Sequence, residues 1–312
     1  MKCSSKLSIS WEIEATEVIN ELVDKVRQSK SQPSVAGILK RVGLSRSNYY
    51  AQKKRPVSVT KLKRQEIKRK IKEIWEESKH IYGAPKITMI PRKNGFHVAI
   101  KTVSNYMREI GIKAHYAKPW TTTTRDSEYS DQLINYLDEH FNPETPNACW
   151  CIDTTYISTR NGFAYLISVM DLYSRRIIAW DLSDNLEVAN VVSLIERAKR
   201  LRGITMPLIM HSDRGSQFTS AAYKAVTADL QLSYSKKAYP WDNACIESFH
   251  ALIKREWLNQ YDIRSHKEAH RLVFEYIETF YNTVRIHSHC DYTSPKDFED
   301  NYYDNQAVIQ AA

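Results

Sequence analysis

The sequence predicts an α/β fold in which a mixed five-stranded sheet flanked by helices follows small all-α modules. Three observations support this prediction. Consecutive β-rich runs begin at residue 149, helical patterns alternate with short apolar strands after residue 187, and the first 118 residues show helical patterns only. A chain of 312 residues is long enough for two or three domains and one sizeable core.

Short helical patterns fill the N-terminal segment, residues 1–56. A first helix is expected over 9–29 and a second over 35–41. Gly43 then permits a tight turn, and Ser45 can cap a third helix that runs through Tyr50. This order is typical of a helix-turn-helix, although a small helical packing module fits the same pattern. The basic run from Lys53 to Lys70 favours DNA binding.

A second helical module is expected over residues 57–118. A charged helix over 60–79 ends before Tyr82-Gly83-Ala84-Pro85, a turn follows at Asn94-Gly95, and a helix over 100–110 ends at Gly111. We interpret this module as a second DNA-binding unit. The expected DNA contacts of the two modules are Arg46, Ser47, Asn48, Lys53, Lys54, Arg55, Lys101, Asn105 and Arg108.

The charge distribution agrees with this division. Residues 1–130 hold 27 Lys and Arg against 12 Asp and Glu, whereas residues 131–312 hold 18 against 24. A basic front half and an acidic back half suit a protein that grips nucleic acid and acts on it elsewhere, although a solvated Lys-rich surface gives the same numbers. The sequence lacks a transmembrane run and a secretory signal, and its five cysteines are scattered, so we expect a cytoplasmic protein without a membrane partner.

The α/β part is expected after a linker and polar helix over residues 119–145, with the helix near 128–141. Strands are expected over 149–159, 163–172 and 176–182, and Asn161-Gly162 predicts a hairpin between the first two. A helix near 187–201, a strand over 207–210, a helix over 220–230, a strand over 232–235 and a helix from 243 follow. This order is that of a ribonuclease-H-like core, expected over residues 146–300, with a tail over 301–312.

Three acidic residues lie where the predicted fold can bring them together. Asp153 is inside the first strand, Asp213 ends an apolar run, and Glu247 begins a helical stretch. Taken singly, Asp153 can face solvent, Asp213 can cap a turn and Glu247 can lie on a helix surface. Converging carboxylates need divalent cations to neutralise them, so the set predicts a Mg²⁺ site for phosphodiester chemistry.

The sequences around these residues resemble the integrase-core (DDE) transposases of bacterial insertion sequences, of the OrfB type found in copy-out, paste-in elements and related to retroviral integrases. The motifs that carry the resemblance include Trp150-x-x-Asp153-x-Thr155-Tyr156-Ile157, His211-Ser212-Asp213-Arg214-Gly215 and Asp242-Asn243-Ala244-x-x-Glu247. Lys254 follows Glu247 at the family's spacing. The others are Tyr82-Gly83-x-Pro85-Lys86, Met107-Arg108-Glu109-x-Gly111, Tyr281-Asn282-x-x-Arg285-x-His287 and Ser294-Pro295.

The resemblance implies a DNA transposase that cleaves and joins strands at the element's terminal inverted repeats and in target DNA. It implies that Asp153, Asp213 and Glu247 bind two Mg²⁺ ions, for which Mn²⁺ substitutes, and that Lys254, Arg214 and Asn243 contact DNA. A homodimer or higher oligomer on DNA and an upstream OrfA partner or frameshift fusion are also implied. The segment between Asp213 and Glu247 holds 33 residues, slightly fewer than the family usually has. We expect this shorter segment to affect DNA handling more than metal binding.

Two other functions remain open at this point. One is a ribonuclease-H-like nuclease that only hydrolyses, and the other is a DNA-binding regulator with an inactive core. The retained carboxylates oppose the second alternative. We exclude a zinc site, because Cys149-x-Cys151 is spaced too closely and falls in a predicted strand.

Overall fold

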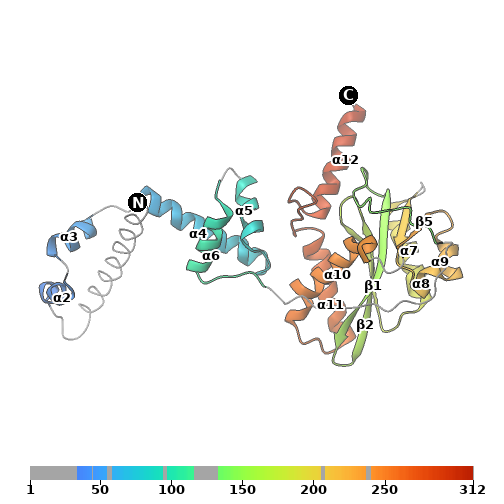
Figure 1. The fold of residues 1–312 in the computed structure, drawn as a ribbon, viewed down its shortest axis with the longest axis horizontal. Helices are drawn as coiled ribbons and strands as arrows, with labels where there is room; N and C mark the ends of the chain where they lie inside the picture. The colour runs from blue at the N-terminus through green and yellow to red at the C-terminus, as the bar shows by residue number, and fades with distance from the viewer. Residues whose placement is uncertain are drawn as a thin grey trace. The chain divides into compact units, whose positions relative to one another are not determined.

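The computed structural model describes residues 34–43, 45–54, 58–93, 97–115, 133–204, 208–236 and 240–311 (Figure 1). The chain divides into two compact units, Met1–Ile67 and Lys68–Ala312. The predicted helix over 9–29, the predicted linker over 119–125, the turn at Asn94-Gly95 and Arg55 lie outside the described residues.

The first unit contains the predicted pair of short helices, α2 (Val35–Val42) and α3 (Arg46–Lys54). The Ser34 hydroxyl caps α2 by accepting from the Gly37 N–H at 3.1 Å. Gly43 ends α2 with a φ of 75°, a left-handed conformation that glycine adopts without a Cβ clash. Leu39 and Tyr49 are buried together between the two helices.

Three further helices follow: α4 (Val59–Glu77), α5 (Ala84–Lys93) and α6 (Ile100–Glu109). Residues of α4 belong to both units. The buried residues of α6 are Val103 and Met107, whose spacing of four places both on one face of the helix. Gly111 follows α6 with a φ of 73° and donates to the Arg108 carbonyl, which confirms the predicted helix end.

A five-stranded sheet with the strand order β3-β2-β1-β4-β5 forms the centre of the second unit. The strands are β1 (Cys149–Thr159), β2 (Gly162–Asp171), β3 (Ile177–Ser183), β4 (Ile209–Ser212) and β5 (Gln231–Tyr234). The first three strands pair antiparallel, and β1–β4 and β4–β5 pair parallel. This is the topology of a ribonuclease-H-like core, so the predicted fold class is confirmed.

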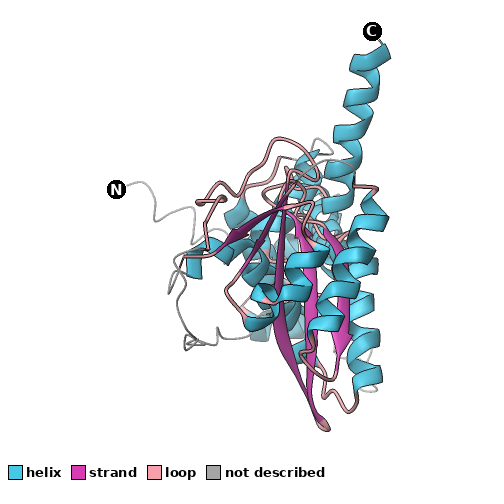
Figure 2. Ribbon diagram, turned by 90° about the vertical axis from the view of Figure 1, so that its right-hand side faces the viewer, coloured by secondary structure: helices cyan, strands magenta, loops and turns pink. Residues whose placement is uncertain are grey.

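Helices cover both faces of this sheet (Figure 2). One apolar core joins Trp150, Ile152, Ile167 and Val169 of the sheet to Val191, Leu194, Ile195 and Ala198 of α7 (Val188–Arg202). The short helices α8 (Ser216–Thr219) and α9 (Ala221–Val226) add Phe218 and Tyr223 to it. The 3₁₀ turn η1 (Pro240–Asn243) precedes α10 (Ala244–Glu256), and α10 and α11 (His266–Tyr276) both contact β1. The turn η2 (Leu258–Gln260), the π-helical turn η3 (Ile277–Tyr281) and α12 (Pro295–Ala311) complete the chain.

The polar helix predicted near 128–141 is wrong for the part that the structure describes, because residues 133–148 form turns and extended chain. The Ser233 hydroxyl accepts from the Tyr136 and Leu137 N–H groups at 3.0 and 3.1 Å. The Tyr234 N–H donates to the Ile134 carbonyl at 2.9 Å. These hydrogen bonds hold the segment along the edge strand β5, where they satisfy backbone groups that a helix would otherwise pair.

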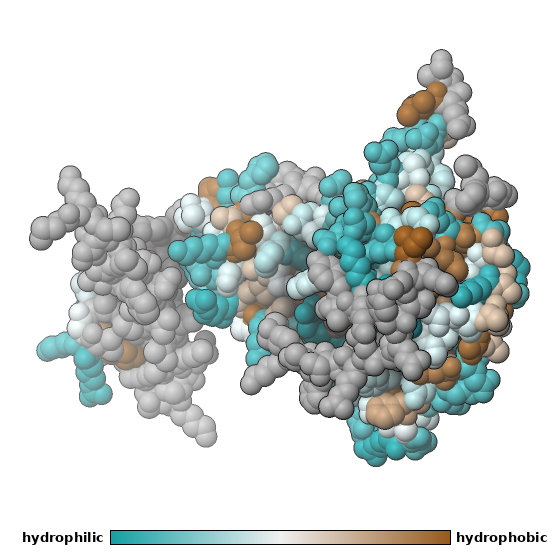
Figure 3. Space-filling model, turned by 45° about the vertical axis from the view of Figure 1, so that its right-hand side comes forward, coloured by the Kyte–Doolittle hydropathy of each residue, from teal (hydrophilic) through white to brown (hydrophobic). Residues whose placement is uncertain are grey.

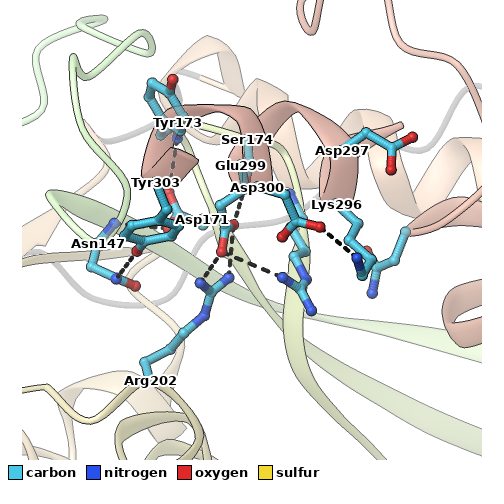
Figure 4. Close-up of polar contacts among 12 residues, drawn as sticks. Asn147, Asp171, Tyr173, Ser174, Arg202, Lys296, Asp297, Glu299, Asp300 and Tyr303 are labelled. Atoms are coloured by element: carbon cyan, nitrogen blue, oxygen red, sulfur yellow. Dashed lines mark hydrogen bonds and ion pairs between the residues drawn. The ribbon is translucent and has the colours of Figure 1, made fainter. Parts of the chain in front are cut away.

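The predicted tail over 301–312 is, as far as it is described, the second half of α12. This helix is anchored by Glu299, whose side chain is buried with 2% exposure. Arg202 and Ser174 both point at its carboxylate (Figure 4), and Arg176 approaches it at 3.3 Å. A carboxylate buried this deeply needs such partners, so α12 is fixed to the turn between β2 and β3 and to the end of α7 by charge as well as by packing.

The motifs around Tyr82 and Arg285 meet in the second unit, although about two hundred residues separate them. The Tyr82 hydroxyl accepts from the Ile286 N–H at 2.8 Å. Beside it, the Arg285 guanidinium donates twice to Glu256 at the end of α10, at 2.7 Å each, and Tyr276 donates to the same carboxylate. Burial and the nearby Arg285 charge lower the pKa of Lys86 to about 7. This buried cluster links the helical module to the end of α10.

The described surface is mostly hydrophilic, with small apolar patches between the polar residues on the face drawn in Figure 3. None of the helices in the described part of the chain combines the length and apolar character that a bilayer crossing requires.

Candidate functional site

The sheet register brings Asp153 and Asp213 together. Strand β1 pairs parallel with β4 so that Ile152 lies opposite Ser212, where β4 ends. Asp153 and Asp213 are the next residue on each chain, and neighbouring strands are separated by only about 4.8 Å. An aspartate in the middle of β1 and one at the end of β4 therefore lie side by side.

Each aspartate is oriented by a backbone amide. The Thr154 N–H donates to Asp153 Oδ1 at 2.8 Å, and the Gly215 N–H donates to Asp213 Oδ1 at 2.9 Å. The Asp213 carboxylate thus accepts from the residue two positions further along the chain, in the turn after β4. The turn-capping role and the ligand role that the sequence left open are thus compatible, because the second carboxylate oxygen has no hydrogen bond among the described residues.

Glu247 comes from the first turn of α10, which packs across β1. Its pKa is raised by burial first, and then by the charges of Asp153 and Asp213. Burial and the Asp153 charge raise the pKa of Asp213 to about 6. The three carboxylates thus repel one another across a partly buried space, and the described residues give Asp213 and Glu247 no ion pair that would relieve this repulsion.

Carboxylate oxygens are the ligands that Mg²⁺ prefers, and three mutually repelling acids are the charge pattern that such an ion stabilises. The donor set therefore fits divalent cations. In the described part of the chain, however, no three His, Cys, Asp or Glu side chains stand close enough together to hold one ion.

Lys254 shares a face of α10 with Glu247, as its spacing of nearly two helical turns predicts. Its ammonium group donates to the Thr155 hydroxyl at 2.7 Å and lies 4.5 Å from the centre of the Tyr156 ring. Burial lowers the pKa of Lys254, and the Asp153 charge opposes that shift. The positively charged ammonium group of Lys254 therefore lies at the border of the carboxylate site.

His250 is a site residue that the sequence analysis did not identify. Its Nδ1 lies 3.4 Å from Asp153 Oδ2, and its Nε2 lies 3.3 Å from the Ser168 hydroxyl. His250 follows Glu247 by three residues, so helical periodicity places both on one side of α10. That spacing was the signal that could have identified it.

His211 is buried and takes no part in the contact between His250 and Asp153. Its two ring nitrogens lie 2.9 and 3.3 Å from the hydroxyls of Ser233 and Ser235, and burial lowers its pKa to about 4. These contacts fit a neutral imidazole that braces β4 against β5.

The structure places the predicted DNA contacts in different surroundings. Arg214 donates to the carbonyls of Ser235 and Leu133 at 2.8 and 3.2 Å. Asn243 is only 4% exposed. Both side chains are therefore part of the packing around the site in this structure. Arg46 and Ser47 on α3 and Lys101, Asn105 and Arg108 on α6 are exposed, whereas the side chains of Asn48, Lys53 and Lys54 lie outside the described ones.

A pocket of about 930 Å³ lies along β5 and residues 133–136. Its lining includes Arg214 and Lys224 but none of the three carboxylates. The electrostatic repulsion, rather than the volume of a cavity, is what marks the candidate site.

Comparison with known proteins agrees with both parts of the chain. Residues 61–120 match the HTH-like domain family, and residues 143–238 and 228–295 match families described as integrase core domain. All three carboxylates fall inside the integrase-core matches.

Two curated relatives match over most of their length. The chain is 36% identical over 252 residues to the transposase for insertion sequence element IS904 of Lactococcus lactis, covering 78% of this chain and 96% of the relative. It is 31% identical over 278 residues to transposase InsF for insertion sequence IS3A of Escherichia coli, covering 88% and 96%.

Among solved structures, the HTLV-2 integrase catalytic core domain in complex with magnesium is similar with a TM-score of 0.40 and 16% identity, covering 50% of this chain and 98% of that one. The chain belongs to the IS3-family, OrfB-type transposases of bacterial insertion sequences and carries an integrase core domain.

Proposed function

We propose that this insertion-sequence transposase binds the terminal inverted repeats of its element and catalyses Mg²⁺-dependent cleavage and transfer of DNA strands. The observation that carries the proposal is the setting of Asp213 and Glu247, whose pKa values are raised first by burial and then by repulsion from the neighbouring carboxylates. Structural ion-pair networks usually lower the pKa of a carboxyl, so two acids with raised pKa values and no ion pair among the described residues, Asp213 and Glu247, favour a functional role.

Asp153, Asp213 and Glu247 would hold the two cations. Bound there, the ions would lower the pKa of the attacking hydroxyl and neutralise charge on the departing oxygen. Mn²⁺ would substitute, because it also takes oxygen ligands.

The chain's own residues would prepare this arrangement. The Thr154 and Gly215 N–H groups fix one oxygen of each aspartate, and the second oxygen of Asp213 has no hydrogen bond among the described residues. His250 restrains Asp153 from the side of α10, at 3.4 Å. Lys254 would contact a DNA phosphate beside the cut as a point charge.

The reaction would proceed in two displacements at phosphorus. In the first, a water oxygen attacks the phosphodiester at the element's end, the bond to the 3′-oxygen breaks, and that oxygen takes up a proton as the free 3′-OH. In the second, this 3′-OH attacks a phosphodiester of another strand and gives up its proton, while the 3′-oxygen of that strand leaves. Neither step needs a covalent bond to the protein.

The helical modules would hold the DNA. The exposed Lys101, Asn105 and Arg108 lie on α6, within the HTH-like match, and Arg46 and Ser47 are exposed on α3. Such side chains at a helix surface can reach phosphates and base edges. Because two element ends must be joined, we also propose a dimer or larger assembly on DNA, which mass measurement with end DNA tests.

The test is incubation of the protein with the ends of its own element and Mg²⁺, followed by mapping of nicked and joined strands. Asp153→Asn should retain DNA binding and lose both products, while Asp304→Asn, an exposed carboxylate on α12, should behave like wild type. Nicks without joined strands would favour a nuclease that only hydrolyses. Binding by the wild type without either product would indicate a regulator and overturn the proposal.

A further inference from the structure

The β1–β2 hairpin carries an aromatic surface that the proposed chemistry does not use. Tyr156 and Phe163 are 48% and 56% exposed, and their rings meet edge to face with centroids 5.4 Å apart. Most aromatic rings of this size are buried, so two exposed rings in contact with each other need a reason.

The sheet register explains why these rings are uncovered. Ile152, Ile167 and Val169 are buried against α7. Tyr156 and Phe163 lie on that same face farther along the hairpin, because Tyr156 pairs with Tyr165 and Phe163 pairs with Ser158. The hairpin extends past the helices that cover the sheet (Figure 2). Its end is nonetheless fixed, because the Arg160 N–H donates to the Ile263 carbonyl at 2.9 Å and the Arg160 side chain pairs with Asp262.

The positively charged ammonium group of Lys254 adjoins this aromatic surface. Strand β4 pairs with β1 only as far as Ile152, so beyond that residue the edge of β1 is open among the described strands. Lys254 reaches this edge from α10 and contacts the Thr155 hydroxyl and the Tyr156 ring, whose residues point to opposite faces of β1. The same ammonium group therefore borders both the carboxylate site and the aromatic pair.

We propose that Tyr156 and Phe163 form a stacking platform for an unpaired nucleotide of the DNA strand whose phosphate Lys254 holds. This inference rests on the proposed function, which supplies DNA as the ligand of Lys254. A positive charge beside exposed aromatic rings is the combination that single-stranded DNA recognises, through its phosphates and the faces of its bases. Separating the two strands at a cut end leaves such an unpaired nucleotide.

A second copy of the chain is a poorer occupant of this surface. Two rings that are each about half exposed offer roughly 200 Å², against about 800 Å² per partner in a stable interface. One nucleotide base, in contrast, needs only the face of one ring.

The test is binding of the full chain to two DNA probes without divalent ions, so that the result does not depend on catalysis. One probe is a blunt duplex of the element end, and the other carries a short single-stranded overhang with a 2-aminopurine base. Phe163→Leu keeps an apolar side chain and removes the ring without touching Lys254. It should weaken binding of the overhang probe at least about fivefold, the lower end of what an aromatic ring contributes per stacked base.

The same variant should lose the fluorescence quenching of 2-aminopurine and bind the blunt duplex as the wild type does. Phe163→Tyr, which keeps the ring, should retain both properties. The matched control is Phe274→Leu on α11, a ring that is 49% exposed and lies outside the platform. It should change neither probe.

Wild-type binding and quenching by Phe163→Leu would overturn the inference, as would an equal loss in Phe274→Leu. A change from dimer to monomer in Phe163→Leu with DNA binding intact would assign the surface to a second copy and also overturn it. Failure of the wild type to cleave DNA, with quenching that still depends on Phe163, would refute the proposed chemistry and leave the platform standing.

Discussion

Replacing Asp213 by asparagine should stabilise the metal-free protein while it abolishes catalysis. Burial and the Asp153 charge raise the pKa of Asp213 from its ordinary value of 3.8 to about 6. A shift of about two units corresponds to roughly 3 kcal/mol at about 1.4 kcal/mol per unit. Because Asp213 is partly exposed, we expect a gain of about 1–3 kcal/mol. The oxygen of the introduced amide can still accept from the Gly215 N–H.

The sign of the pH dependence follows from the same shift. An acid whose pKa is higher in the folded state binds more protons there, so the wild type loses stability as the pH rises from about 4 to about 6. The gain from Asp213→Asn should thus be full near pH 7.5 and vanish near pH 4, where the wild-type carboxyl is protonated.

Thermal unfolding in a chelating buffer measures this effect. A gain of about 1–3 kcal/mol should raise the midpoint by roughly 2–10 °C for a unit of this size. Mg²⁺ should stabilise the wild type and leave the variant unchanged, because the variant has lost a ligand. Asp304→Asn is the control and should not shift the midpoint. An Asp213→Asn protein that unfolds cooperatively at or below the wild-type midpoint near pH 7.5 would falsify the repulsion on which the proposed site depends.

Three further predictions follow from charges described above. Lys254→Gln should weaken DNA binding and reduce the salt slope of log K by about 0.9, the contribution of one phosphate contact, whereas an unchanged slope would exclude that contact. Its thermal midpoint should not fall, because burial already disfavours the Lys254 charge. Arg285→Ala should destabilise the protein by about 3–5 kcal/mol, because it leaves Glu256 charged and buried, and Arg285→Met with Glu256→Leu should recover part of that loss in denaturant titrations. Glu299→Ala should leave Arg202 unpaired under α12, so limited proteolysis should cut at α12 first, and a cleavage pattern like that of the wild type would show that packing alone holds the helix.

The strands and the carboxylate pair were predictable because their signals are local. Asn161-Gly162 indicated the hairpin between β1 and β2. The β-rich runs and the short apolar run before Asp213 placed the strands to within about two residues of their observed ends. Once these strands were placed, the parallel neighbours β1 and β4 had to bring Asp153 and Asp213 to the same edge.

The remaining features depend on partners far away in the sequence. A polar helix was predicted near 128–141, yet Ser233 and Tyr234 hold the described part of that segment along β5. The sequence around Glu256, Arg285 and Glu299 gives no sign of their burial, and only the tertiary structure shows that each is buried with an opposite charge. His250 was overlooked because its spacing of three residues from Glu247 is common on helices, and only the fold shows that it contacts Asp153 on the neighbouring strand.

The junction of Tyr82, Glu256 and Arg285 has a consequence for shortened gene products, which are a natural outcome of decay in mobile elements. A polypeptide ending just after α10 would contain all three acids of the site and read as an intact enzyme by its motifs. It would lack Arg285, which neutralises Glu256, and Ile286, whose N–H donates to the Tyr82 hydroxyl. Such a fragment would lose the attachment of its helical module and the neutralisation of a buried charge together, so the completeness of residues 281–287 is a better guide to a working copy than the carboxylates alone.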